Sequence, residues 1–243
     1  MTTEEQKLSL VQHLTALRGC LIRGSLALIA TSLVSLYFSK QIFEFLQQPL
    51  IRHFHAGSSF IATSPLEAVV TYLKVGLLSG LFLSSPFLLY QVWLFIAPGL
   101  YAKERRYAMT FVGSSTLLFV GGAAFGYYVI FPFGFDFFVS LLTGTQIQFL
   151  PRMEDYLGFV TKMLLTFGGI FELPLILVAL AVMGVVHHKQ LASWRRYVLV
   201  LTFLVGGILT PGPDVMSQFL MSVPLLILYE VSLLIIRFIE KKN

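Results

Sequence analysis

The chain has 243 residues, of which 56% are hydrophobic and 12% charged, and its formal net charge at pH 7 is +5. Soluble domains carry about 25% charged residues, so a chain with half that fraction has too little polar surface to cover a water-soluble globule. The basic residues form short clusters between apolar runs, a pattern typical of orientation signals in membrane proteins, and we therefore exclude a nucleic-acid-binding surface.

The chain divides into a polar start and six apolar runs. Residues 1–19 carry an apolar stripe at Leu10, Leu14 and Leu17, which predicts a short helix lying on the membrane surface. No small-residue cleavage site follows the first run, so we expect that run to remain as an anchor. The chain is thus predicted to be one all-α polytopic membrane domain, 1–243, with a surface segment at 1–19, six transmembrane helices within 21–236 and a tail at 237–243. The runs are roughly 21–39, 68–95, 108–131, 157–183, 197–210 and 215–236.

The last two runs differ from the first four in length and continuity. The fifth, from Tyr197 to Thr210, has 14 residues, about 21 Å of helix at ~1.5 Å per residue. A hydrocarbon core of ~30 Å needs about 20 residues. The sixth run is interrupted by Pro224. We therefore expect a pair of short final helices that thin the bilayer or lie behind their neighbours.

The lysines and arginines predict the orientation. Twelve of the 17 fall in segments on the side of the N-terminus and three in segments on the other side, while Lys74 and Lys162 lie within apolar runs. Short cytoplasmic segments carry such an excess, so both termini are expected in the cytoplasm. On the outer side, Ser64-Pro65-Leu66-Glu67 reads as a capping box that begins the second membrane helix.

Glu172 is the most unusual charge, because it lies near the centre of the fourth run. A carboxylate at mid-bilayer costs about 2.5–3.5 kcal/mol on insertion scales. The residue either faces a cavity or a partner, or forms a buried pair with Lys162 or Lys74. Those two lysines lie nearer the outer ends of their runs, where snorkelling accounts for both.

Motifs for catalysis or metal binding are missing: there is no His-Glu-x-x-His, Gly-x-Ser-x-Gly, phosphate-binding glycine loop or cysteine cluster. We therefore expect no enzyme and no cofactor. By local pattern alone, Glu104 is a surface ion-pair member, Asp214 is the N-cap of the sixth helix, and Gln218 can form a hydrogen bond across helices. Adjacent His187 and His188 are read as a solvated turn.

Several stretches, in order along residues 13–218, resemble the TatC family. The longest is Tyr90–Tyr101 followed by Glu104-Arg105-Arg106; the others are His13-Leu14, Leu17-Arg18, Pro49-Leu50-Ile51, Ile61-Ala62-Thr63, Phe171-Glu172-Leu173-Pro174, Arg196-Tyr197-Val198, Thr210-Pro211, Pro213-Asp214-Val215 and Ser217-Gln218. The resemblance implies a receptor for twin-arginine signal peptides and the core scaffold of the Tat translocase. That machine exports folded proteins across the bacterial cytoplasmic (inner) membrane with the proton motive force.

The resemblance also implies roles for particular residues. Signal-peptide binding is expected at Glu104, Arg18, Leu17, Phe95, Pro49 and Arg105. A carboxylate receives the planar fork of an arginine in two parallel hydrogen bonds, which a lysine does not reproduce. The fifth and sixth helices, with Thr210, Asp214 and Gln218, resemble the docking surface for the single-span partners TatA and TatB, and Glu172 is expected on the concave side. Self-association in a multimeric receptor complex is also expected.

One departure from the family pattern concerns the N-terminal acid. The family commonly has His-Leu-x-Glu-Leu-Arg, whereas here Ala16 stands at the glutamate position. Three alternatives remain open: Glu4 or Glu5 substitutes for the missing acid, backbone carbonyls accept the arginines, or the affinity for the signal peptide is lower. The other readings of the chain are a small-solute or ion secondary transporter, disfavoured because no internal repeat is found, and a membrane-embedded enzyme, disfavoured by the missing motifs.

Overall fold

The structure is a computed structural model that describes residues 10–52, 59–96, 105–142, 150–209 and 215–242. Within these ranges six helical spans are long and apolar enough to cross a membrane, so the predicted all-α fold with six membrane helices is confirmed. The helices are α1 Leu10–Tyr37, α2 Ser39–Leu46, α3 Gln48–Ile51, α4 Pro65–Ile96, α5 Arg105–Phe125, α6 Phe131–Leu142, α7 Met153–Phe171, α8 Leu173–Val182, α9 His188–Leu209 and α10 Val215–Lys242.

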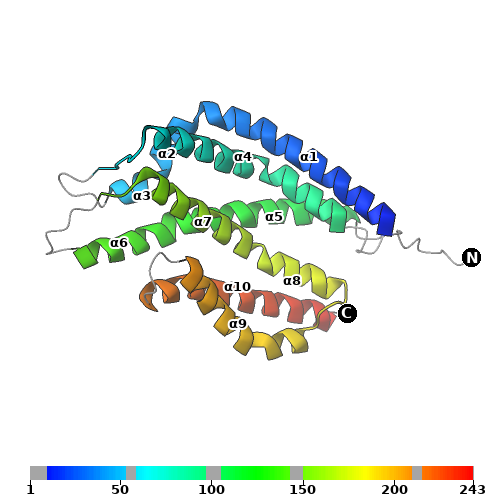
Figure 1. Cartoon of the computed structure of the whole chain (residues 1–243). Helices are drawn as coiled ribbons and strands as arrows, with labels where there is room; N and C mark the ends of the chain where they lie inside the picture. The colour runs from blue at the N-terminus through cyan, green and yellow to red at the C-terminus, as the bar shows by residue number, and fades with distance from the viewer. Residues whose placement is uncertain (1–9, 53–58, 97–104, 143–149, 210–214, 243) are drawn as a thin grey trace, which may run out of the picture.

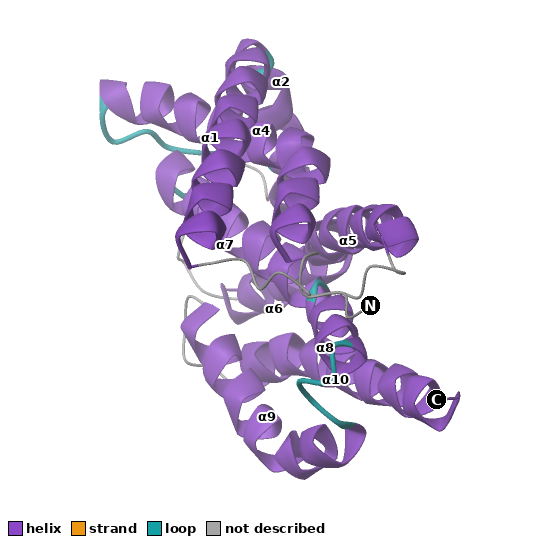
Figure 2. Cartoon of the chain, turned by 90° about the vertical axis from the view of Figure 1, so that its right-hand side faces the viewer, coloured by secondary structure: helices purple, strands orange, loops and turns teal. Residues whose placement is uncertain are grey.

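The bundle has two ends that the chain reaches alternately. Figure 1 shows the beginning of α1 and the end of α10 at one end, on the right, which we call the proximal end. The opposite, distal end carries α2 and α3. Figure 2 looks onto the proximal end and shows the α1–α4 pair at the top, α5 and α7 in the middle and α8 to α10 below.

Small residues let α1 and α4 approach closely. Gly76 and Gly80 of α4 face α1, and a Cβ added to Gly80 would lie 2.6 Å from the Cα of Ser32. The hydroxyl of Thr31 donates a 2.9 Å hydrogen bond to the Gly80 carbonyl. Membrane helices associate through such small residues, because close backbone contact maximises van der Waals packing where lipid is as apolar as the side chains.

The third and fourth spans are each made of two helical segments. α5 continues into α6 through a π-helical turn, Gly126–Ile130. α7 ends at Phe171 and α8 begins at Leu173, where Pro174 has no N–H to continue the helical ladder. α5 and α7 pack closely at Gly168, where an added Cβ would lie 2.8 Å from the Phe119 ring.

The main core is aromatic and lies between α2, α4, the third span and α7. Phe131 and Phe167 are its largest fully buried side chains, and Met221 brings the beginning of α10 into the same cluster. A second, smaller core lies between α8, α9 and α10; it consists of Val186, Leu191, Tyr229, Leu233 and Ile236. The second and third spans, α2, α3 and α7 therefore share the main core, and α8 to α10 largely have their own.

Two expectations about helix boundaries need correction. α1 runs from Leu10 to Tyr37 without a break, so the separate surface helix is wrong for residues 10–19, and Leu14 and Leu17 belong to the first turns of the spanning helix. α9 begins at His188, because the polar residues before Tyr197 extend the apolar run as helix. The spans of α9 and α10 have 21 residues each and are the shortest of the six in the described chain, but each reaches the about 20 residues that a hydrocarbon core needs. The expected 14-residue fifth span, too short to cross, is therefore wrong, and α10 continues as one helix through Pro224.

Candidate functional site

The proximal ends of α1 and α4 bring three predicted site residues together. Leu17 and Arg18 lie on the early turns of α1, and Phe95 lies on the last turn of α4. The two helices are antiparallel, with Gly24 opposite Leu88; seven residues further toward the proximal end, this register brings Leu17 level with Phe95. Both side chains are half-buried and Arg18 is exposed. The result is an apolar surface beside an exposed guanidinium.

The acidic groups expected beside this surface are only partly within the described residues. Glu104 lies in the segment 97–104, outside them. α4 ends at Ile96 and α5 begins at Arg105, so the segment that carries Glu104 connects two helix ends that lie at the proximal end. Ala16, at the position of the second expected acid, is exposed on α1. A longer side chain at position 16 would therefore meet no packed neighbour.

Pro49 does not join the other predicted signal-peptide residues. It lies in α3 at the distal end, and it is buried. The resemblance grouped Pro49 with Leu17, Arg18 and Phe95, which the fold places at the other end of the membrane helices. The neighbours of Pro49 are residues of the distal end.

Glu172 occupies the break between α7 and α8. Its Oε2 accepts a 2.6 Å hydrogen bond from the Ser115 hydroxyl of α5. Its Oε1 is buried with no hydrogen-bond partner among the described groups, and the residue is only 8% exposed. Lys74 pairs with Glu154 instead, so the buried pair of Glu172 with Lys74 is wrong. Among the described residues, one carboxylate oxygen is therefore hydrogen-bonded within the chain and the other is not.

Sequence reasoning missed Ser115, although it is a polar residue inside an apolar run. Ser115 is fully buried, and its partner lies 57 positions further along the chain. A serine hydroxyl can equally bond a carbonyl one turn back in its own helix, so the sequence alone does not identify the partner.

Of the three residues predicted to form a docking surface on the last two helices, the structure describes Gln218. Thr210 and Asp214 lie in the segment 210–214, outside the described residues. The half-buried side chain of Gln218 lies over Gly207 of α9, where an added Cβ would be 2.5 Å from its Nε2. One turn further on, the Ser222 hydroxyl donates a 3.0 Å hydrogen bond to the Thr202 carbonyl. Polar side chains thus join α9 and α10 closely.

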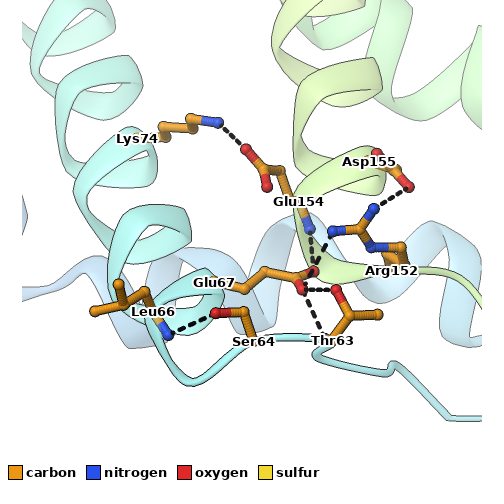
Figure 3. Close-up of polar contacts among 8 residues, drawn as sticks. All are labelled: Thr63, Ser64, Leu66, Glu67, Lys74, Arg152, Glu154 and Asp155. Atoms are coloured by element: carbon orange, nitrogen blue, oxygen red, sulfur yellow. Dashed lines mark hydrogen bonds and ion pairs between the residues drawn. The ribbon is translucent and has the colours of Figure 1, made fainter.

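A network at the distal end centres on the buried carboxylate of Glu67 (Figure 3). Its Oε2 accepts hydrogen bonds from the Thr63 N–H at 2.7 Å and the Thr63 hydroxyl at 2.9 Å. Its Oε1 accepts one from the Glu154 N–H at 3.3 Å, and Arg152 approaches Oε2 at 3.5 Å. The predicted N-terminal cap of α4 is present, but Glu67 reaches back to Thr63, while Ser64 receives the N–H of Leu66.

The same carboxylate serves two helix beginnings. Thr63 precedes α4, and Glu154 is in the first turn of α7. N–H groups in the first turn of a helix have no intrahelical acceptor, and a negative charge there is stabilised by the helix dipole. Lys74, expected to snorkel, lies beside this network and forms a 2.6 Å ion pair with Glu154. The sequence predicted that Glu67 caps the beginning of α4, but not that the same carboxylate also bonds the first turn of α7.

Glu240 plays a comparable part at the proximal end of the last helices. Its Oε1 accepts a 2.9 Å hydrogen bond from the N–H of His188, the first residue of α9, and lies 3.5 Å from Nδ1 of His187. His187 is exposed, in keeping with a solvated turn, whereas His188 begins the helix and is half-buried. The end of α10 thereby joins the start of α9.

The whole chain resembles known proteins. Residues 12–224 match the family model for the Sec-independent protein translocase protein (TatC). A relative of that name from Desulforapulum autotrophicum is 42% identical over 243 residues, which is 100% of this chain and 89% of the relative. The Escherichia coli protein of the same name is 40% identical over 235 residues, covering 96% of this chain and 90% of its own.

The fold agrees with a solved structure. A crystal structure of the twin-arginine translocase receptor TatC matches with a TM-score of 0.82 and 37% sequence identity, over 93% of this chain and 98% of that one. Similarity of this extent covers all six spans and the proximal and distal ends.

Proposed function

Because the chain belongs to the TatC family of Sec-independent protein translocase subunits, we propose that its proximal end is the cytoplasmic receptor surface for twin-arginine signal peptides. The protein is a component of the twin-arginine translocase that works with other Tat components, and it is a multi-pass protein of the bacterial inner membrane. The family is one of translocase subunits and not of enzymes, and the small-solute transporter reading is not favoured.

The observation that supports a receptor surface is the register of α1 and α4. It brings Leu17 level with Phe95 beside the exposed Arg18, next to the segment that carries Glu104. The apolar pair provides a surface for the hydrophobic part of a signal peptide. Glu104 receives the arginine pair, since a carboxylate accepts a guanidinium in two parallel hydrogen bonds, and Arg105 and Arg18 flank it.

Peptide capture tests this surface. Immobilised peptides with Arg-Arg and Lys-Lys are offered to the purified full-length protein, and the Arg-Arg peptide is expected to be captured preferentially. Glu104→Ala should weaken that capture at least about tenfold, because a hydrogen bond to a charged group contributes about 1.5–3 kcal/mol. Glu44→Ala is the matched control, since Glu44 is an exposed carboxylate on α2 at the distal end. Equal capture of both peptides, or equal effects of the two variants, would contradict the proposal.

The absent second acid allows a gain-of-function test. Ala16 is exposed on α1, so Ala16→Glu adds a carboxylate without disturbing the packing. If the missing acid lowers the affinity, Ala16→Glu should raise capture of the Arg-Arg peptide several-fold and leave the Lys-Lys peptide almost unchanged. No gain would mean that another acceptor, such as Glu4 or Glu5, already occupies the place of that acid.

We also propose that Glu172 and the last two helices receive the single-span partners TatA and TatB. The unpartnered Oε1 of Glu172 is suited to a hydrogen bond from a polar side chain of a partner helix, because unsatisfied polar groups are costly in hydrocarbon. Thr210, Asp214 and Gln218 complete the docking surface at the α9–α10 turn. Multimeric receptor complexes and use of the proton motive force follow from the same role.

Transport by variants of Glu172 tests its part. Glu172→Leu is expected to abolish most transport, whereas Glu172→Gln, which keeps an acceptor oxygen, should retain a larger share. Ser115→Ala removes the internal partner alone and serves as the control for loss of packing. Unchanged transport in Glu172→Leu would count against the assignment.

A further inference from the structure

The distal end offers an account of Pro49 that does not involve the signal peptide. The chain coils in an α-like way from α2 into α3, and Gln47 between them has helical torsion angles of φ −79° and ψ −13°. In a continuous helix the N–H four residues on donates to each carbonyl. Residue 49 is a proline without an N–H, but the carbonyl of Phe45 still accepts a backbone N–H at the C-terminal cap of α2.

A tyrosine from the third span supplies a donor to that carbonyl. The Tyr127 hydroxyl donates a 2.5 Å hydrogen bond to the Phe45 carbonyl, and its ring stacks on that of Phe45 with centroids 4.8 Å apart and planes 18° apart. Tyr127 is 6% exposed and lies in the π-helical turn between α5 and α6. A π-turn inserts one extra residue and rotates the following side chains relative to a regular helix.

The next carbonyl, that of Leu46, has no regular backbone donor. The N–H of Leu50 donates instead to the Gln47 carbonyl, three residues back, at 3.1 Å, and the residue at the same spacing from Leu46 is Pro49, which has no N–H. The hydroxyl of Tyr156, on α7, donates a 2.7 Å hydrogen bond to the Leu46 carbonyl. Tyr156 is 5% exposed and Leu50 1% exposed, so these groups are shielded from water.

These contacts connect four spans at one place. α2 continues the chain from α1 and packs against α4, and α3 packs against α6. Tyr127 adds the π-helical turn and Tyr156 adds α7. We propose that Pro49, Tyr127 and Tyr156 form a distal joint that holds the first four membrane helices in their relative positions. Pro49 is in this proposal a positioning residue, which acts by leaving the Leu46 carbonyl for Tyr156, while Tyr127 adds a second hydrogen bond to the Phe45 carbonyl.

A double-variant cycle tests the joint on the purified full-length protein, with the thermal midpoint Tm as the readout. Tyr156→Phe removes only a hydroxyl and should lower Tm by about 3–8 °C, because it deprives the buried Leu46 carbonyl of its donor. Tyr128→Phe is the control, since Tyr128 is 65% exposed, and it should change Tm by no more than about 1 °C.

Pro49→Ala then provides the decisive comparison. Alanine restores an N–H three residues after Leu46, the spacing at which Leu50 donates to Gln47, so removing the Tyr156 hydroxyl should cost less than half as much in the Pro49→Ala background. Tyr127→Phe should show no such rescue, because its acceptor, the Phe45 carbonyl, already receives a backbone N–H. Additive losses for Tyr156→Phe and Pro49→Ala would overturn the proposal, as would equal rescue of both tyrosine variants. If Tyr156→Phe protein fails to accumulate, restored accumulation in the double variant supports the joint, and failure to restore it contradicts it.

Function separates a positioning role from a binding role. Pro49→Ala should leave capture of the Arg-Arg peptide within about twofold of the unchanged protein, while transport falls in Tyr156→Phe and recovers in the double variant of Tyr156→Phe with Pro49→Ala. A loss of capture as large as that of Glu104→Ala would place Pro49 in the binding surface and overturn the positioning role. The Tm cycle does not depend on the proposed receptor function, so the two proposals can fail separately.

Discussion

The helices from α1 to α7 and the last three helices, α8 to α10, are held together in different ways. In the first region, described side-chain hydrogen bonds join residues far apart in the sequence, such as Tyr156 with Leu46, 110 positions apart, and Glu67 with Glu154, 87 positions apart. In the region of α8 to α10, Ser222 meets Thr202 over 20 positions and Tyr229 meets Leu191 over 38. The first region is thus an arrangement of distant segments, and the second is centred on a hairpin of neighbours.

This difference bears on where each region can open. A contact between neighbours in the chain closes a short loop, so breaking it frees little additional chain. A contact between distant segments positions whole helices, so its loss is felt across the bundle. The first region therefore suits a rigid receptor frame, and the hairpin suits a surface that adjusts to partner helices. The variants below test this contrast, in order of expected effect.

Glu67→Ala should have the largest effect. It removes the acceptor for the N–H groups at the beginnings of both α4 and α7 and for the Thr63 hydroxyl, and it leaves Arg152 with its 3.9 Å ion pair to Asp155. We expect Tm to fall by at least about 5 °C. Glu154→Ala, which loses the partly exposed pair with Lys74 but keeps its backbone N–H, should lower Tm much less. Equal losses would show that Glu67 acts as a surface charge only.

Gly80→Ala should be the next most damaging change. The added methyl would meet the Ser32 backbone, and overpacking typically costs about 1–3 kcal/mol. Gly113→Ala on α5 is the control: an added Cβ there has no atom within 4 Å, and alanine is the better helix former by up to about 1 kcal/mol. Thermal unfolding should therefore separate the two variants in opposite directions. A neutral Gly80→Ala would argue against close α1–α4 contact.

Tyr229→Phe probes the second region with a single hydroxyl. It removes the 2.7 Å hydrogen bond to the Leu191 carbonyl and should cost about 1 kcal/mol. Hydrogen exchange of the α9 amides should rise more than exchange in α7, because the opening is local. Equal increases in both helices would show that the two regions unfold as one unit and would remove the contrast.

Arg195→Gln should have the smallest effect. Its 2.7 Å ion pair with Glu230 joins side chains that are 55% and 47% exposed, and exposed pairs contribute about 0.2–1 kcal/mol. We expect a loss of under about 0.5 kcal/mol in the free energy of unfolding that vanishes at high salt. A larger, salt-independent loss would mean that the pair lies in a drier place than its exposure indicates.

Composition and pattern predicted that lipid surrounds the chain, that it has six membrane spans, and where its polar residues lie. Low charge and six apolar runs predict six membrane helices, because a chain in hydrocarbon must satisfy its backbone within helices. The resemblance carried by Tyr90–Arg106 and the other stretches indicated the family. The N-terminal cap at Glu67 was also readable, since its donors are local.

Which distant residues contact one another depends on how the helices pack, and the sequence did not predict it. The partner of Glu172 is Ser115, the Glu67 carboxylate also serves α7, and Pro49 lies far from Leu17 and Phe95. Each of these depends on the register and order of packed helices. Helices in a membrane present similar apolar faces to one another, so the apolar pattern does not select a neighbour; close glycine contacts and a few hydrogen bonds do, and these are decided in three dimensions.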